Sequence, residues 1–220
     1  MASQRIAETE ALPRLSFAVE SAAAVEYAAA PTLAFELSIE SDRPVRSLSL
    51  NVQIRIAAAR RAYDRDEQER LVELFGTPDR WSETLRGLLW TNATLVVPPF
   101  SGTGRATLTV PCTYDFEVAA AKYFHALADD EVPLELLFSG TVFYAAENGL
   151  LRTAHIPWDC DARFGLPVGT WKQALANRFP NSAWLRVDRV VFDRLLAYKA
   201  RRTLPTWEAA LEELLDRSEA

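Results

Sequence analysis

The sequence predicts an α+β fold, in which a single domain is built on a twisted antiparallel sheet of five or six strands. Apolar and polar residues alternate strictly in several segments, which is typical of strands with one buried face. A helical hairpin is predicted as an insertion at about residues 64–91. Helical periodicity returns at about residues 168–217, where the helices are expected to pack on one face of the sheet. No linker long or polar enough to separate domains is present, so residues 1–220 are expected to form one domain.

The first strands are predicted in the N-terminal quarter of the chain. Alternating apolar residues indicate strands at residues 15–19, 33–39 and 47–56. The link at residues 41–46 is short and polar and contains Pro44. We therefore interpret the second and third strands as an antiparallel hairpin with one face exposed to water.

Three more strands are predicted further along the chain, at residues 107–118, 132–144 and 150–156. Pro111 has no amide hydrogen to donate, which indicates an edge strand or a bulge at that position. Alternation on one face favours an antiparallel sheet, because the strands of a doubly covered parallel sheet are apolar throughout.

Helix signals separate the two groups of strands. Asp64 and Glu67 have the spacing of a capping box, and Gly76 ends the apolar stripe that follows them. A Thr-Pro pair at residues 77–78 has the layout of a second helix start, and the apolar face of this helix continues to Leu89.

Three helices are predicted in the last third of the chain. They lie at residues 168–179, 188–202 and 206–217, and Pro180 and Pro205 separate them.

The composition limits the class of protein. With 49% hydrophobic and 25% charged residues, the chain lies in the globular range. Its net charge of −6 disfavours a nucleic-acid partner, because binding to phosphates needs a concentrated basic surface. The N-terminus lacks the pattern of a secretion signal, and no apolar run is long enough to cross a bilayer. Two cysteines fit a reducing compartment, so we expect a soluble cytoplasmic protein with no membrane partner.

No motif of a metal or nucleotide site is complete. We interpret the Gly-Thr-Gly sequence at residues 102–104 as a turn, because a phosphate-binding loop leads into a helix and this one leads into a strand. His155, Asp159, Cys160 and Asp161 cluster in the sequence, but a zinc site would need further ligands from a chain with one other His and one other Cys. We predict neither a metal nor a cofactor.

Catalytic groups are equally sparse. Cys112 and His125 are a conceivable nucleophile and base, but Cys112 falls on the apolar face of its strand. Asp115 and Glu117 point the same way from that strand, and we interpret them as solvated carboxylates. An enzyme stays open as an alternative, with a site assembled from scattered titratable residues: Asp115, Glu117, His125, His155 and Asp159.

The chain has six tryptophans, a residue that is favoured both in cores and at contact surfaces. Three of them lie on helical stripes and are predicted to be core residues: Trp81, Trp171 and Trp207. The other three stand outside clear stripes and are the candidate partner-contact residues: Trp90, Trp158 and Trp184.

Three blocks of sequence, at residues 114–118, 137–143 and 156–158, resemble an uncharacterised bacterial family of similar length. The resemblance covers most of the chain. Members of that family are often encoded near nickel–iron hydrogenase genes, so the resemblance implies an accessory or assembly role rather than catalysis.

The second half also resembles the SecB export chaperone in the order of its elements. The strand at residues 137–143 precedes the helix at residues 168–179, and residues 184–188 lead into another helix. This resemblance implies binding of unfolded or apolar segments in grooves between sheet and helices. The insertion at residues 64–91 and the longer acidic tail depart from the SecB pattern.

We therefore expect a non-enzymatic accessory or chaperone-like protein that binds another protein or an unfolded polypeptide segment. The contact would be an apolar groove or a sheet edge. Hydrogenase assembly is the setting that the resemblance implies. An enzyme and a structural subunit of a larger complex remain the alternatives, and the sequence does not define the oligomeric state.

Overall fold

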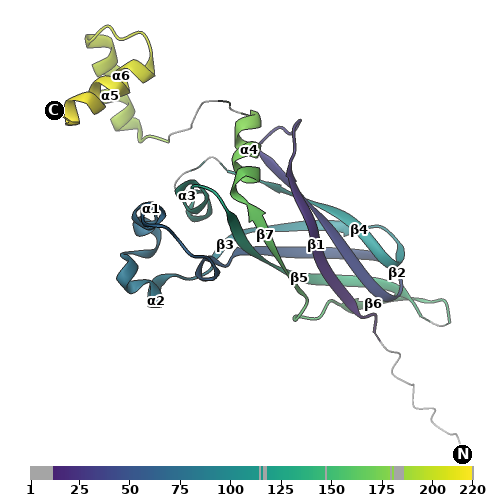
Figure 1. The fold of residues 1–220 in the computed structure, drawn as a ribbon. Helices are drawn as coiled ribbons and strands as arrows, with labels where there is room; N and C mark the ends of the chain where they lie inside the picture. The colour runs from purple at the N-terminus through teal and green to yellow at the C-terminus, as the bar shows by residue number, and fades with distance from the viewer. Residues whose placement is uncertain are drawn as a thin grey trace, which may run out of the picture. The chain divides into compact units, whose positions relative to one another are not determined.

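The computed structural model describes residues 12–113, 115, 118–146, 148–178, 180 and 186–219. The chain divides into two compact units, residues 1–183 and residues 184–220. The first is a sheet with helices, and the second is a pair of helices (Figure 1). The predicted α+β class with an antiparallel sheet is confirmed, but among the described residues the sheet has seven strands instead of five or six, because β3 and β7 add to the predicted set.

The elements follow one another in this order: β1 (Leu15–Ala24), β2 (Thr32–Ile56), the 3₁₀ turn η1 (Ala58–Arg60), α1 (Arg65–Phe75), the 3₁₀ turn η2 (Pro78–Arg80), α2 (Trp81–Thr84), β3 (Leu88–Val97), β4 (Phe100–Pro111), α3 (Ala119–Ala126), β5 (Glu131–Ala145), β6 (Leu151–His155), β7 (Asp161–Pro167), α4 (Val168–Arg178), α5 (Arg189–Arg201) and α6 (Trp207–Glu219).

Strand β2 is the long central strand of the sheet. Its first half pairs with β1 and β4, and its second half pairs with β5 and β3. The predicted hairpin of residues 33–39 and 47–56 is therefore wrong, because both runs belong to one strand. The pairing register shifts between Ser41 and Val45, so the polar link forms a bulge instead of a turn. In this bulge the Ser41 hydroxyl donates to the carbonyl of Arg43 over 2.7 Å.

The sheet bends strongly at this bulge. Phe17 of β1 lies opposite Ile39, and Phe138 of β5 lies opposite Val52, thirteen residues further along β2. A straight strand would separate these positions by about 43 Å, yet the rings of Phe17 and Phe138 stack with centroids 4.2 Å apart. The two halves of the sheet are therefore folded onto each other, and β1 crosses over β5 in Figure 1.

The inner faces of the two halves form the core. The alternation in the sequence predicts these faces correctly, because outside the bulge of β2 and Gly140 of β5, every second residue of these strands is buried. The buried positions on these strands include Leu33, Phe35, Leu37, Ile39, Leu48, Leu50, Val52, Ile54, Ile56, Val132, Leu134, Leu136 and Phe138.

Helix α1 confirms the first half of the predicted hairpin at residues 64–91. Asp64 caps it, and the Asp64 carboxylate accepts from the amide of Glu67 over 2.8 Å. The second predicted helix is wrong beyond Thr84, because the chain enters β3 at Leu88. Gly87 disfavours a continuous helix, and pairing with β2 gives every residue of Leu88–Val97 except Trp90 a partner on one side.

Strand β4 ends at Pro111 and, among the described residues, pairs with β2 alone, which confirms the predicted edge position. The continuation of this strand to residue 118 is wrong, since Cys112, Thr113, Asp115 and Val118 lie outside any strand. The turn predicted at residues 102–104 is also wrong. This segment lies inside β4, and Gly102 has the positive φ of +69° opposite the bulge of β2.

The C-terminal helices lie where the sequence predicts them. Helix α4 contacts β1, β2 and β7 and so covers part of the folded sheet. Helices α5 and α6 confirm the predictions at residues 188–202 and 206–217. The packing of these two helices on the sheet, and hence one domain over residues 1–220, stays a prediction. No described helix has both the length and the apolar character needed to cross a membrane.

Candidate functional site

The titratable residues of the enzyme alternative lie on separate elements. His125 is on α3, His155 ends β6, Asp159 precedes β7, and Asp115 lies between β4 and α3. Glu117 falls outside the described residues. The cleft described below is lined by none of these residues.

Cys112 is a buried thiol rather than an accessible nucleophile. Its side chain is 5% exposed, and its sulfur lies 3.8 Å from the carbonyl of Val110. Burial raises the pKa of Cys112 to about 12, so the thiol is protonated at neutral pH. The ring of His125 packs edge-on against Trp171 with centroids 4.7 Å apart, and burial lowers the pKa of His125. Cys112 thus lies in the core, and His125 packs against the edge of it.

The run from His155 to Asp161 spans the end of β6, a loop and the start of β7. The Cys160 sulfur contacts the carbonyl of Leu15 at 3.8 Å, which ties the loop to β1. Burial and the neighbouring carboxylates raise the pKa of Cys160. Within the described residues, no three His, Cys, Asp or Glu side chains are grouped so that they could hold a metal ion.

The three candidate contact tryptophans have different surroundings. Trp158 is 94% exposed. Trp90 is half-buried, and its ring lies 5.0 Å from the ring of Phe124 and 6.2 Å from that of Phe35. Trp184 lies outside the described residues. Trp90 therefore packs against the core, whereas Trp158 is free to contact another molecule.

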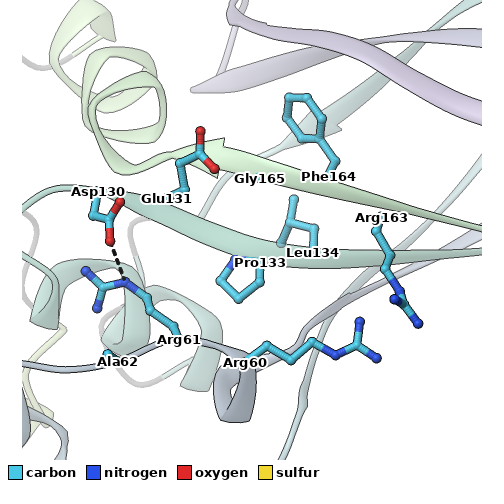
Figure 2. A pocket seen from close by; sticks show the side chains of 10 residues that line it. All are labelled: Arg60, Arg61, Ala62, Asp130, Glu131, Pro133, Leu134, Arg163, Phe164 and Gly165. Carbon is cyan, nitrogen blue, oxygen red and sulfur yellow. Dashed lines mark ion pairs between the residues drawn. The ribbon is translucent and has the colours of Figure 1, made fainter.

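A cleft of about 550 Å³ opens between the turn η1 and the strands β5 and β7. Figure 2 shows that Asp130, Glu131 and Arg61 lie at one end of it, while Arg60 and Arg163 extend toward the other. Its apolar floor is formed by Pro133, Leu134 and Phe164. The cleft thus presents charges of both signs over an apolar surface, and no His, Cys, Ser or Lys is among its lining residues.

An ion pair fixes the back of this cleft. The Arg61 guanidinium binds both carboxylate oxygens of Glu67, at 2.8 and 2.9 Å, and these side chains are 7% and 4% exposed. Glu67 also accepts from the amide of Ala128, and Arg61 donates to the carbonyl of Asp129. Burial acts to raise the pKa of Glu67, but the hydrogen bonds from Arg61 and Ala128 outweigh it and hold this pKa below its usual value. The pair therefore joins α1 to the loop between α3 and β5.

A row of side chains crosses the outer face of the sheet from β3 to the cleft. Leu89 of β3 lies opposite Arg55 of β2, Arg55 opposite Glu135 of β5, and Glu135 opposite Arg163 of β7. Arg60 adds a further guanidinium, 2.8 Å from Glu135. Glu135 thus pairs with Arg60 and has Arg55 and Arg163 as its cross-strand neighbours.

Strand β3 is an open edge of the sheet. In the described part of the chain it pairs with β2 alone, and the pairing is regular from Thr91 to Val97. None of its ten residues is charged. The outward-facing Leu89 and Val96 are 53% and 72% exposed. Edge strands are usually protected by charges, prolines or short length, and the segment Thr91–Val97 has none of these protections.

A family model described as "Family of unknown function (DUF6084)" matches residues 12–220. The match covers nearly the whole chain, including both compact units. The chain belongs to the DUF6084 family. This membership agrees with the predicted resemblance to an uncharacterised family of similar length. No curated protein matches the chain.

Solved structures show only faint likeness to this DUF6084 protein. A β-glucosidase from Kluyveromyces marxianus has a TM-score of 0.26 at 7% identity, over 70% of this chain and 15% of that one. OgpA from Akkermansia muciniphila has a TM-score of 0.21 at 14% identity, over 74% of this chain and 32% of that one. The DUF6084 chain thus spans a small part of the length of both proteins.

The sequence pattern misses the β3 edge and the cleft of this DUF6084 member. A signal for the edge is present, because residues 88–97 are rich in Thr and Val and lack charge. The cleft has no such signal. Its Leu134 and Phe164 come together only through the register of β5 and β7, which the sequence does not define.

Proposed function

We propose that this DUF6084 protein is a non-enzymatic accessory protein that binds another polypeptide, and that the partner adds a strand to the edge of β3. The observation that carries the proposal is the uncharged segment Thr91–Val97, which is paired on one side only among the described residues. In strand addition, main-chain hydrogen bonds supply affinity and alternate side chains supply specificity.

The geometry of β3 defines the kind of segment that fits. Leu89 and Val96 are exposed on the outer face, and polar Asn92 and Thr94 lie between them. An extended, weakly charged segment with apolar residues near both ends matches this face. Carboxylates of the bound segment would pair with the guanidinium of Arg55. Arg55 lies on the neighbouring strand β2, opposite Leu89 of β3.

The resemblances give this proposal a narrower form. The family resemblance suggests a subunit of a nickel–iron hydrogenase during assembly, and the SecB-like order of elements suggests an unfolded segment as the bound form. In either form the interaction takes place in the cytoplasm. This narrower form rests on the resemblances alone, whereas strand addition rests on β3.

Purification of the tagged full chain from a native lysate tests the proposal. We expect a polypeptide partner in a stoichiometric amount, measured by mass. The double variant Leu89→Lys/Val96→Lys places charges on the edge strand and should reduce the recovered partner by about tenfold or more.

The matched control is Leu150→Lys/Tyr27→Lys, which adds the same charge at exposed apolar positions outside β3. This control should retain the partner. Absence of any stoichiometric partner, or equal recovery with the β3 variant and the control, would refute the proposal.

A further inference from the structure

The second unit exposes most of its apolar side chains. Helices α5 and α6 have 13 residues each, and a helix pair of this size is marginal in water unless it is covered. Within residues 186–219, Ala210 is the one hydrophobic residue that is fully buried. The large apolar residues that are exposed are Val190, Val191, Phe192, Leu196, Trp207, Leu211 and Leu215.

One side of the pair is used to hold the two helices together. The ring centroids of Phe192 and Trp207 lie 5.4 Å apart, and the Lys199 ammonium lies 5.7 Å from the centroid of the Trp207 ring. Glu213 of α6 binds Arg202 at 2.6 Å, next to the end of α5. Within residues 186–219, these contacts leave other faces of both helices uncovered by the pair itself.

A groove runs along α5 on one of those faces. Its volume is about 470 Å³, and its apolar lining includes Val191, Leu195 and Leu214. Arg194 and Arg201 also line it, seven residues apart and hence on the same side of the helix. Neither arginine has an ion-pair partner in the part of the chain that the structure describes. The groove is therefore apolar at its base and basic along one side.

Helix α6 carries the complementary surface. Leu211 and Leu215 are exposed and one turn apart, so they form an apolar ridge. Glu208 and Glu212 are also one turn apart and lie beside this ridge. Within their bounds, α5 has four basic residues and one acidic residue, whereas α6 has five acidic residues and one basic residue.

We propose that a second copy of this chain covers these faces, with the α6 ridge of each copy lying in the α5 groove of the other. A two-fold symmetric dimer uses each surface twice, and the result is a four-helix bundle. Charge complementarity favours a second copy as the molecule that fills the α5 groove, because the same helix pair carries both the basic groove and the acidic ridge. The Arg194 side of the groove would then face Glu208 and Glu212 of the second copy.

A charge-swap experiment on the full-length protein tests this dimer. Sedimentation equilibrium should give twice the mass of one chain. The reversal Arg194→Glu/Arg201→Glu should weaken the dimer by at least about tenfold, because several rim contacts become repulsive. The reversal Glu208→Arg/Glu212→Arg should do the same, and the variant with all four substitutions should regain the dimer.

The control variant Arg46→Glu/Arg152→Glu reverses two exposed charges on the sheet unit and should leave the dimer unchanged. Circular dichroism of each variant establishes that α5 and α6 remain helical. A monomer at all concentrations, a dimer that both reversals leave intact, or a four-fold variant that stays monomeric would overturn the proposal.

Discussion

Trp90 is the extra residue of a β-bulge in β3, and its ring lies 5.0 Å from that of Phe124 on α3. The register places Thr91 opposite Ile54 and Leu89 opposite Arg55, so Trp90 has no partner in β2. The bulge turns this side chain toward the core and fixes α3 against the inner face of β3.

Replacing Trp90 by Ala should therefore destabilise the fold. We expect a loss of about 2–4 kcal/mol in the free energy of unfolding, measured by urea denaturation, because a large half-buried ring is removed. Trp158→Ala is the control. Trp158 is 94% exposed, so its removal should change the stability by less than about 0.5 kcal/mol. Equal effects of the two substitutions would contradict the placement of Trp90.

Glu67→Gln should destabilise the protein strongly at neutral pH. The substitution removes the close carboxylate partner of the Arg61 guanidinium, which is 7% exposed, and leaves it the exposed Asp130 carboxylate at 3.9 Å; loss of such a buried pair costs about 3–5 kcal/mol. The control is Glu69→Gln, which breaks the exposed pair with Arg65 and should cost less than about 0.5 kcal/mol. The prediction is wrong if urea denaturation shows no difference between these two variants.

The same pair predicts how stability depends on pH. Because the pKa of Glu67 lies below its ordinary 4.5 in the folded chain, the stabilisation is complete above about pH 4.5 and is lost as the pH falls below that value. The stability of the parent should therefore decrease more steeply than that of Glu67→Gln between about pH 4.5 and pH 2. Parallel stability curves would show that Glu67 does not titrate in this way.

The two thiols should react with a disulfide reagent at different rates. Cys112 is 5% exposed and its pKa is raised to about 12, whereas Cys160 is partly exposed. In the folded protein at pH 8, we expect Cys160 to be modified first and Cys112 only at the rate of unfolding. The single variants Cys112→Ala and Cys160→Ala show which thiol gives the fast phase of the modification reaction and which gives the slow phase. A fast phase that survives in Cys160→Ala would contradict the burial of Cys112.

The sequence predicts those elements whose signals are local. The capping box of Asp64 and Glu67 defines the start of α1, and strict alternation defines the inner faces of β2 and β5. Helix α3 has no such signal, since it is only eight residues long, five of them are buried, and its polar side chains are limited to Lys122 and His125.

Elements that depend on distant pairing are not predictable in this way. A polar link with a proline, as at residues 41–46, has the same composition in a turn and in a bulge. Here the pairing of β1 and β4 with the first half of β2 decides between them. The bulge at Trp90 shifts the alternation of apolar and polar residues in β3 by one position. The start of β3, and with it the candidate edge, is therefore not recognisable from the sequence pattern.

Amide hydrogen exchange of β3 in the presence of the captured partner tests strand addition most directly. Exchange of the amides of Thr91–Val97 that point away from β2 should slow by at least about tenfold in the complex, because a new strand would bond to them. Amides of the exposed edge strand β6 serve as the internal reference and should not change. If the partner binds and the β3 amides exchange at the same rate as in the free protein, the account of this edge as the binding site is wrong.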